Sequence, residues 1–169
     1  MCFIRSYLAY WYLRWARKPW SRVVRHLIEK NTGELPAVAT VADVRNALNE
    51  IVWTKDKWID YISFPKHIYR TKKGDCDDYS VLGCALLAKI KINAAILSVI
   101  VADAKKSHAI CIFWDGPDLC FFDNARYGVQ PRGERNILSI VDRIARGSKA
   151  LAWSIEDYEG NIIRVKRGR

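Results

Sequence analysis

Cys76 is the residue whose position most directly indicates chemistry. It lies in the stretch KKGDCDDYSVLG, residues 72–83, directly in front of an apolar run with helical spacing. A helix N-terminus presents unpaired backbone N–H groups and the positive end of the helix dipole, and both stabilise a thiolate. The position of Cys76 therefore favours a nucleophile.

The acids around this cysteine support a second interpretation. Asp75, Asp77 and Asp78 would raise the pKa of the Cys76 thiol unless a cation, a capping role or a histidine offset them. In a purely structural account, Asp75 caps the helix, Asp77 and Asp78 complement its dipole, and Cys76 is a small residue at a turn. A catalytic role for Cys76 requires a partner base.

His108 is the histidine best placed to be that base. It opens the strand-like run HAICIFW, which leads through DGPD into LCFFDN. This is the pattern of a β-hairpin. If Asp115 and Asp118 close its turn, His108 and Asp123 become diagonal neighbours on one face, within reach of each other.

The same register sets Asn124 on the opposite face of the hairpin. Gly116-Pro117 is not a usual two-residue turn, and a slip by one residue would separate His108 from Asp123. Taken alone, His108 could also be a half-buried strand residue bonded to a backbone carbonyl. A carboxylate beside it and a thiol upstream instead complete an arrangement of nucleophile, base and orienting group.

The elements that must position these residues are helices first and strands afterwards. Apolar spacing predicts helices over residues 41–53 and 76–89, with an irregular segment at 54–75 between them. Beyond these, β-rich runs predict strands at AAILSVIVA, HAICIFW, LCFFD, ALAWSIE and NIIRVK, and NILSIVDRIAR is predicted to be a helix. We therefore expect an α+β fold with a mainly antiparallel sheet.

Residues 1–30 are predicted to form a basic, aromatic helical arm in front of a domain at residues 31–169. Pro19 is expected to break or restart the helix of the arm. One stripe of this helix carries Ile4, Leu8, Trp11 and Trp15. The stripe either packs onto the protein's own core or docks the domain to an anionic envelope, an acidic protein or another copy of the chain.

The net charge of +10 lies mainly at the two ends of the chain. Residues 1–30 hold seven cations and one acid, and residues 159–169 hold four cations and one acid, which leaves the centre nearly neutral. We therefore expect attraction to an anionic partner to come from the termini. Nucleic acid is not expected to be that partner.

The cysteine pattern argues against both zinc and a disulfide framework. The five cysteines form no CxxC pair, and the histidines lack zinc-ligand spacing. An odd count in apolar surroundings favours reduced, buried thiols, although Cys111 and Cys120 could come close to each other. The N-terminus is interrupted by Arg5 and Arg14 and resembles neither a secretory signal nor a membrane span, so cytoplasmic synthesis is expected.

The chain resembles the transglutaminase-like cysteine proteases, bacterial members in particular. The resemblance is carried by GDCDDYS (74–80), SHAICIF (107–113) and FFDN (121–124), and by the lead-in DYISFPKHIYRTKKGDCDDY. It implies a papain-like α+β core, with the nucleophile's helix packed on an antiparallel sheet. It further implies Cys76 as nucleophile, His108 as general base and then acid, and Asp123 as the group that orients His108.

The resemblance also bears on the rest of the site. The oxyanion would be held by the Cys76 backbone N–H and one upstream donor, with Trp53, Trp58 and His67 as candidates. No cofactor is required. Some bacterial relatives bind calcium through acids next to the cysteine, which here would be Asp75 and Asp77, but two ligands are few for calcium and a capping role is favoured.

Three functions are consistent with this resemblance. The first is a hydrolase that cleaves a peptide or amide bond through a thioester, with a cell-wall peptide as one substrate. The second is a binding or assembly module in a virion such as a phage tail, where small stand-alone relatives occur. The third is a protein cross-linking transglutaminase. An intact triad favours an enzyme, and water is the default acceptor in so small a domain.

Overall fold

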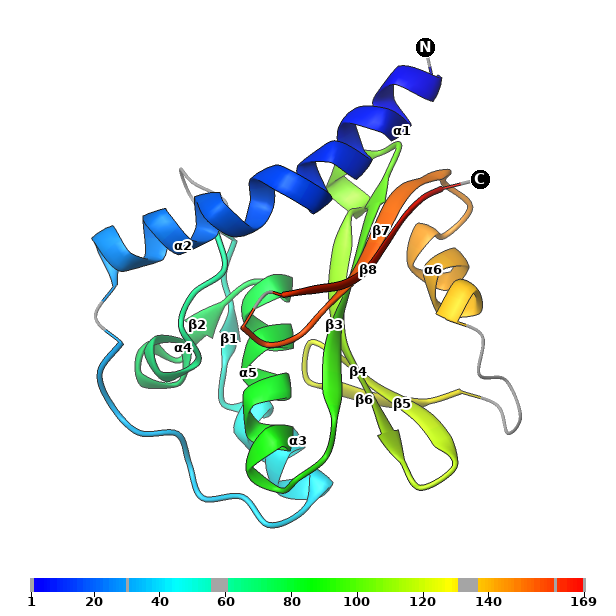
Figure 1. The fold of residues 1–169 in the computed structure, drawn as a ribbon. Helices are drawn as coiled ribbons and strands as arrows, with labels where there is room; N and C mark the ends of the chain where they lie inside the picture. Colours follow the sequence, from blue (N-terminus) through cyan, green and yellow to red (C-terminus); the bar gives the residue numbers. More distant parts are fainter. Residues whose placement is uncertain (1, 30, 56–60, 131–136, 160, 169) are drawn as a thin grey trace.

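Helices precede an antiparallel sheet in the computed structural model, which describes residues 2–29, 31–55, 61–130, 137–159 and 161–168 (Figure 1). The helices are α1 (Cys2–Trp11), a π-helix (Tyr12–Ala16), α2 (Arg17–Ile28), α3 (Val41–Asn49), α4 (Pro65–Thr71), α5 (Cys76–Lys89), a 3-10 turn (Ala104–Lys106) and α6 (Ile137–Ala145). The strands are β1 (Val52–Trp53), β2 (Lys73–Gly74), β3 (Ala94–Val101), β4 (His108–Asp115), β5 (Asp118–Asp123), β6 (Arg126–Val129), β7 (Ala150–Glu156) and β8 (Ile162–Arg167).

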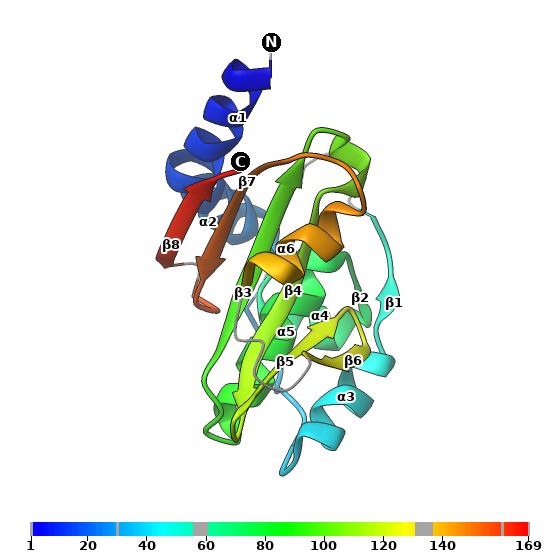
Figure 2. The same ribbon diagram turned by 90° about the vertical axis from the view of Figure 1, so that its right-hand side faces the viewer.

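The main sheet has six strands in the order β6-β5-β4-β3-β7-β8, and every neighbouring pair is antiparallel. A separate short parallel pair joins β1 to β2. Helix α6 lies on one face of the sheet and α5 on the other (Figure 2). The predicted α+β fold, with the helix that begins at Cys76 packed on an antiparallel sheet, is confirmed.

Side chains of β4 alternate between these two layers, as strand geometry requires. Cys111 and Phe113 pack toward α5, whereas Ile110 and Ile112 pack toward α6. Cys111 and Cys120 are buried free thiols on the α5 side, as predicted. His108 has the same parity as Ile110, so its side chain starts on the α6 side of the sheet.

The β4–β5 hairpin has the register predicted from the sequence. Asp115 pairs with Asp118, and Cys111 pairs with Phe122. Gly116 makes this turn with a φ of 58°, the positive value that a type II′ turn needs at its first central residue. Gly116-Pro117 is therefore a regular two-residue turn, because glycine carries no Cβ to oppose that φ.

The arm differs from its prediction at Pro19. The chain stays helical through Pro19, and the irregularity lies upstream, in the π-helix Tyr12–Ala16. A proline is tolerated in the first turn of a helix, where its missing N–H removes no intrahelical bond. The shift in hydrogen-bond spacing at the π-helix therefore lets α2 begin directly before Pro19.

The predicted stripe of the arm faces outward. Ile4, Leu8, Trp11 and Trp15 are between 50% and 64% exposed. The opposite side of α1 packs on β7 and β8, where Ala9 and Leu13 contact Leu151 and Ala152 and the Ser6 hydroxyl donates to the Leu151 carbonyl over 2.6 Å. None of the described helices is long and apolar enough to cross a bilayer.

The segment between the second predicted helix and Cys76 is more regular than expected. Helix α3 ends at Asn49, and Val52 and Trp53 form β1 instead of continuing it. Pro65, expected to keep the segment irregular, instead begins α4, because proline fits the first helical position. This segment carries the backbone directly past the start of α5.

Candidate active site

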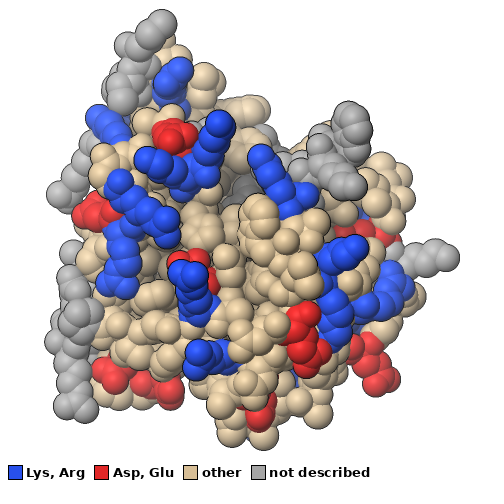
Figure 3. Space-filling view, turned by 180° about the vertical axis from the view of Figure 1, so that it is seen from behind, with Lys and Arg blue, Asp and Glu red and all other residues tan. Residues whose placement is uncertain are grey.

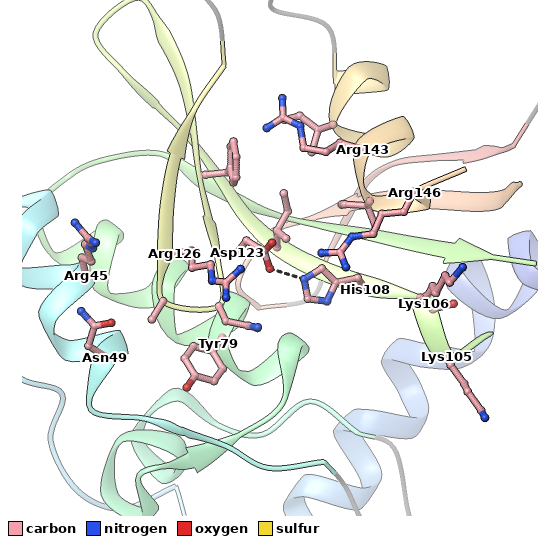
Figure 4. A pocket seen from close by; sticks show the side chains of 17 residues that line it. Arg45, Asn49, Tyr79, Lys105, Lys106, His108, Asp123, Arg126, Arg143 and Arg146 are labelled. Atoms are coloured by element: carbon pink, nitrogen blue, oxygen red, sulfur yellow. Dashed lines mark hydrogen bonds and ion pairs between the residues drawn. The ribbon is translucent and has the colours of Figure 1, made fainter. Parts of the chain in front are cut away.

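His108 and Asp123 form the closest ionic contact of the candidate site. The His108 Nε2 lies 2.6 Å from Asp123 Oδ1, and both side chains are partly buried (Figure 4). The hydrogen bond from His108 lowers the pKa of Asp123, and the charges of His108, Arg146 and Arg126 act in the same direction. The ionised carboxylate accepts, so Nε2 carries the proton and Nδ1 is the nitrogen that can act as a base. The predicted proximity of His108 and Asp123 is confirmed.

A tight turn fixes Asp123 at the end of β5. Asp123 pairs with Arg126 across the turn Asn124-Ala125, and Asn124 has a left-handed φ of 53°. Asn124 lines the same cavity as His108 and Asp123, but residues of both layers line this cavity, so the placement of Asn124 on the opposite face of the hairpin stays a prediction. Its left-handed φ ends the strand alternation directly after Asp123.

Cys76 is the first residue of α5, where the sequence predicted it. The Asp75 carboxylate caps the helix by accepting from the backbone N–H groups of Asp77 at 3.0 Å and Asp78 at 3.4 Å. Asp78 is buried, and its carboxylate accepts from the Ser63 N–H at 2.9 Å. Asp75 and Asp78 therefore have structural roles, and together they fix the start of the helix at Cys76.

Gly74 explains how the chain enters this turn so closely. A Cβ on Gly74 would lie 2.6 Å from the Cβ of Asp78, a distance that real side chains do not adopt. Gly74 therefore allows the strand β2 to pass directly over the first turn of α5. The glycine of the Gly-Asp-Cys motif is therefore a steric requirement of this turn.

The packing of α5 on β4 relates Cys76 to His108. The two elements run in the same direction, since each is joined to β3 by a reversal of the chain (Figure 1). The Sγ atoms of Cys84 and Cys111 lie 3.3 Å apart. Cys84 is about 12 Å along α5 from Cys76, and Cys111 is about 10 Å along β4 from His108. The start of α5 and the start of β4 therefore lie at the same end of the domain.

A cavity of about 700 Å³ opens at this end of the sheet (Figure 4). Its lining joins the two layers, with Asn49 and Tyr79 from the α5 side and Ile140 from α6, around His108 and Asp123. Tyr79 follows Cys76 by three residues, which places the two on adjacent turns of one helix side. Helix α5 thus reaches the cavity that contains His108 through Tyr79, whereas Cys76 is not among the lining residues. A direct contact between Cys76 and His108 remains a prediction.

Six cations line this cavity and were not singled out in the sequence. They are Arg45, Lys105, Lys106, Arg126, Arg143 and Arg146, and Asp123 is the one acid among the lining residues that the structure describes. The rear face of the molecule is hollowed near its upper centre, and Lys and Arg side chains gather around the hollow (Figure 3). The nearly neutral centre of the chain therefore gathers positive charge locally around this cavity, in addition to the cations at the two ends.

The three candidates for the second oxyanion donor have different outcomes. Trp53 pairs with Gly74 in the β1–β2 ladder, and Thr54 N–H donates to the Gly74 carbonyl at 2.9 Å, so this backbone lies close to Cys76. His67 is engaged elsewhere, because its ring contacts Arg70 at 3.1 Å and Glu29 at 3.7 Å. Trp58 lies outside the described residues. Trp53 is therefore the better-placed of the two described candidates.

The acids beside Cys76 do not make a calcium site by themselves. Calcium takes about six to eight oxygen ligands, whereas one of the two predicted ligands, Asp75, already caps α5. No group of three or more His, Cys, Asp or Glu able to hold a metal occurs among the described residues. Calcium at Asp75 and Asp77 therefore stays a prediction, and it would need further oxygen ligands.

Comparisons with known proteins identify one family and two similar solved structures. Residues 7–129 match the sequence model of the family described as Transglutaminase-like domain, a range that includes Cys76, His108 and Asp123. No curated protein sequence matches the chain. One similar solved structure is calcium-bound LapG of Legionella pneumophila, at 14% identity and a TM-score of 0.49, covering 76% of this chain and 70% of LapG. Another is a candidate cysteine protease of Cytophaga hutchinsonii, at 18% identity and a TM-score of 0.43, covering 94% of this chain but 53% of that protein.

Proposed function

The chain belongs to the transglutaminase-like domain family, and on that premise we propose that it is a cysteine-nucleophile hydrolase of peptide or amide bonds. Cys76 would be the nucleophile, His108 the general base and then acid, and Asp123 the group that orients His108. The observation that carries the proposal is the 2.6 Å bond between His108 Nε2 and Asp123 Oδ1. This bond leaves Nδ1 for the thiol, at the end of the domain where α5 begins.

The reaction proceeds in two halves. The Cys76 thiol gives its proton to His108 Nδ1, and the thiolate attacks the substrate carbonyl carbon. The C–N bond then breaks, the amine leaves with the proton from His108, and a thioester remains on Cys76. Water, deprotonated by His108, cleaves the C–S bond and restores the thiol.

Two parts of the fold support these steps. The N-terminal N–H groups of α5 favour negative charge on the sulfur, and the Cys76 backbone N–H can donate to the oxyanion together with a donor from the β1 segment near Gly74. Asp123 stabilises the imidazolium that forms when His108 takes the proton. The capped start of α5 holds Cys76 in place during both halves.

Alkylation of Cys76 by iodoacetamide tests this proposal without a known substrate. In a Cys2→Ser background, we expect the wild type to be modified at Cys76 at about pH 6 much faster than an ordinary thiol, because the imidazolium retains the thiolate. His108→Gln should remove this advantage, and Asp123→Asn should reduce it. Modification is located by mass spectrometry of the digested protein.

The same experiment separates the alternatives. Rates at Cys76 that are ordinary and unaffected by His108→Gln would overturn the hydrolase and favour a binding or virion assembly module. If Cys76 forms a thioester with a peptide substrate, adding hydroxylamine or a primary amine shows whether the acyl group passes to an amine or to water. A dominant amine product over hydrolysis would favour a transglutaminase.

A further inference from the structure

The cavity beside His108 has an excess of positive charge that the proposed chemistry does not require. Asp123, its one described acid, is already bonded to His108. Lys106 forms an ion pair with Asp103 at 3.7 Å, and the structure gives the other five lining cations no ion-pair partner among the described residues. Like charges gathered in a cleft repel one another and attract anions. The cluster is therefore arranged for an anionic ligand.

The cations lie on several sides of His108 (Figure 4). Arg126 and Arg146 are close enough to Asp123 to influence its pKa, Arg45 comes from α3, and Arg143 comes from α6. Apolar side chains fill the wall between them: Ile110, Phe121, Ile140 and Ile144. A wall of this kind accommodates a peptide with both apolar and acidic side chains better than a uniformly charged polyanion.

We propose that this cavity binds a peptide segment whose acidic side chains flank the scissile bond. The proposal rests on the proposed function, because it takes His108 to mark the reacting centre. Arg143 and Arg146 would bind carboxylates on one side of that bond, and Arg45 and Arg126 on the other. Guanidinium groups suit this role because they bind carboxylates through two parallel hydrogen bonds.

Two alkylating reagents, one charged and one neutral, test the electrostatic potential at Cys76. Iodoacetate is an anion and iodoacetamide is neutral, so the ratio of their rates reports local potential independently of thiol reactivity. We expect this ratio to be raised in the wild type and to fall on the order of tenfold in Arg126→Gln/Arg146→Gln, and also to fall with added salt. Lys91→Gln/Lys166→Gln, which removes two exposed cations outside the cavity, should leave the ratio unchanged.

Peptide cleavage supplies the second measurement. We compare the cleavage of three pools of fluorogenic peptides. Around the cleaved bond, the first pool carries Asp and Glu, the second carries the amides Asn and Gln, and the third carries Lys and Arg. The acidic pool should be cleaved on the order of tenfold faster than its amide counterpart, and the double Arg126→Gln/Arg146→Gln variant should lose that preference. The control variant Lys91→Gln/Lys166→Gln should keep the preference for the acidic pool.

The outcomes separate this inference from the proposed function. Ordinary, His108-independent alkylation by both reagents means that the hydrolase itself is wrong. Fast, His108-dependent alkylation with an unchanged reagent ratio and no preference among the pools overturns only the acidic peptide. Equal cleavage of all pools, with strong inhibition by a DNA oligonucleotide, would instead indicate a nucleic-acid site.

A separate observation concerns the outer side of α1 and the π-helix. Five large apolar side chains there are at least half exposed: Ile4, Tyr7, Leu8, Trp11 and Trp15. Arg5 and Arg14 are exposed beside them, and residues 2–28 contain no acid. The opposite side of α1 already packs on β7 and β8. This outer apolar face is therefore left to a ligand outside the chain.

We infer that the outer apolar face lies on an anionic lipid surface. Trp and Tyr favour the interfacial region of a bilayer, and arginines without neighbouring acids complement its phosphates. An acidic groove of another protein would need to match an apolar strip along the whole helix as well as the charge. A lipid surface, in contrast, has no fixed shape to match, so the exposed aromatic, apolar and arginine side chains of α1 are sufficient for binding.

Vesicle sedimentation tests this inference. The full chain should bind vesicles containing phosphatidylglycerol and phosphatidylcholine more tightly than pure phosphatidylcholine vesicles. Trp11→Ser/Trp15→Ser should reduce binding on the order of tenfold, whereas Trp114→Ser, at an exposed tryptophan on β4, should not. Equal binding by all variants, or self-association of the wild type that Trp11→Ser/Trp15→Ser abolishes, overturns the lipid surface.

Discussion

The Cys84 and Cys111 sulfur atoms lie 3.3 Å apart between α5 and β4. Both thiols are buried, and burial together with the neighbouring Cys84 raises the pKa of Cys111 well above its ordinary value. A protonated thiol without solvent access does not react with alkylating agents. Burial between α5 and β4 therefore keeps both thiols away from solvent and inert.

The first prediction is an order of cysteine reactivity in the folded protein. In the Cys2→Ser background, iodoacetamide should modify half-buried Cys76 first, and Cys84, Cys111 and Cys120 only after unfolding. Mass spectrometry with and without urea checks the order. Early modification of Cys111 would show that the α5–β4 contact opens readily, and would remove the basis for placing Cys76 near His108.

The second prediction concerns the pH dependence of stability. The folded-state pKa of Asp123 is lowered, mainly by the hydrogen bond from His108. Its contribution to stability is therefore full above the ordinary carboxyl pKa of about 3.9 and is lost as the pH falls through the lowered value. The difference in unfolding free energy between the wild type and Asp123→Asn should be constant at about pH 5–6 and shrink below about pH 4.

Asp142→Asn is the matched control for this measurement, since Asp142 is exposed on α6. Urea denaturation at a series of pH values gives both curves. A difference that grows toward low pH would contradict the ionised state of Asp123 in the bond with His108.

The third prediction concerns the attachment of the arm to the segment before α4. Buried Glu29 accepts from the Tyr61 hydroxyl at 2.9 Å and from the Phe64 N–H at 2.8 Å, one donor for each carboxylate oxygen. Glu29→Gln turns one of these oxygens into a donor and leaves a buried group without its partner. The loss should be about 1–3 kcal/mol of unfolding free energy.

Glu34→Gln provides the comparison, because Glu34 is exposed in the following loop. It should change the unfolding free energy by less than about 0.5 kcal/mol. Equal stability of Glu29→Gln and Glu34→Gln in urea denaturation would mean that residues 61–64 are not held by the arm.

The core elements of the fold were predictable because their local patterns are complete. Helix α5 has both a capping acid at Asp75 and an apolar run, and its bounds match the expectation. The hairpin register was predicted from Asp115 and Asp118 as the pair that closes the turn, and this register correctly placed His108 beside Asp123. These features depend on residues near one another in sequence, where propensity and pattern act together.

The features that the sequence missed depend on tertiary context. Pro19 lies inside a helix because a π-helix precedes it, and the four-residue strand β6 pairs only after the turn at Asn124. The cations of the cavity come from α3, the 3-10 turn, β6, α6 and the residue that follows α6. No local spacing connects them, so only the folded chain reveals the cluster.

The last prediction concerns the turn that ends β5. Asn124 has a φ of 53°, a value that glycine and asparagine tolerate and β-branched residues do not. Asn124→Val should cost about 1–2 kcal/mol of stability, whereas Asn124→Gly should be close to neutral. Because Asp123 is the preceding residue, strain in the Val variant should also displace its carboxylate from His108 Nε2.

The displacement has its own signature, which a change in stability alone would not produce. In Asn124→Val, the NMR signal of the His108 Nε2 proton should shift at a fixed pH, because its bond to Asp123 is lost, and Cys76 alkylation at about pH 6 should slow. Asn124→Gly should retain both properties of the wild type. If Asn124→Val loses stability but leaves the His108 Nε2 proton signal and the alkylation rate unchanged, the turn does not position Asp123, and the bond from His108 depends on the β4–β5 pairing alone.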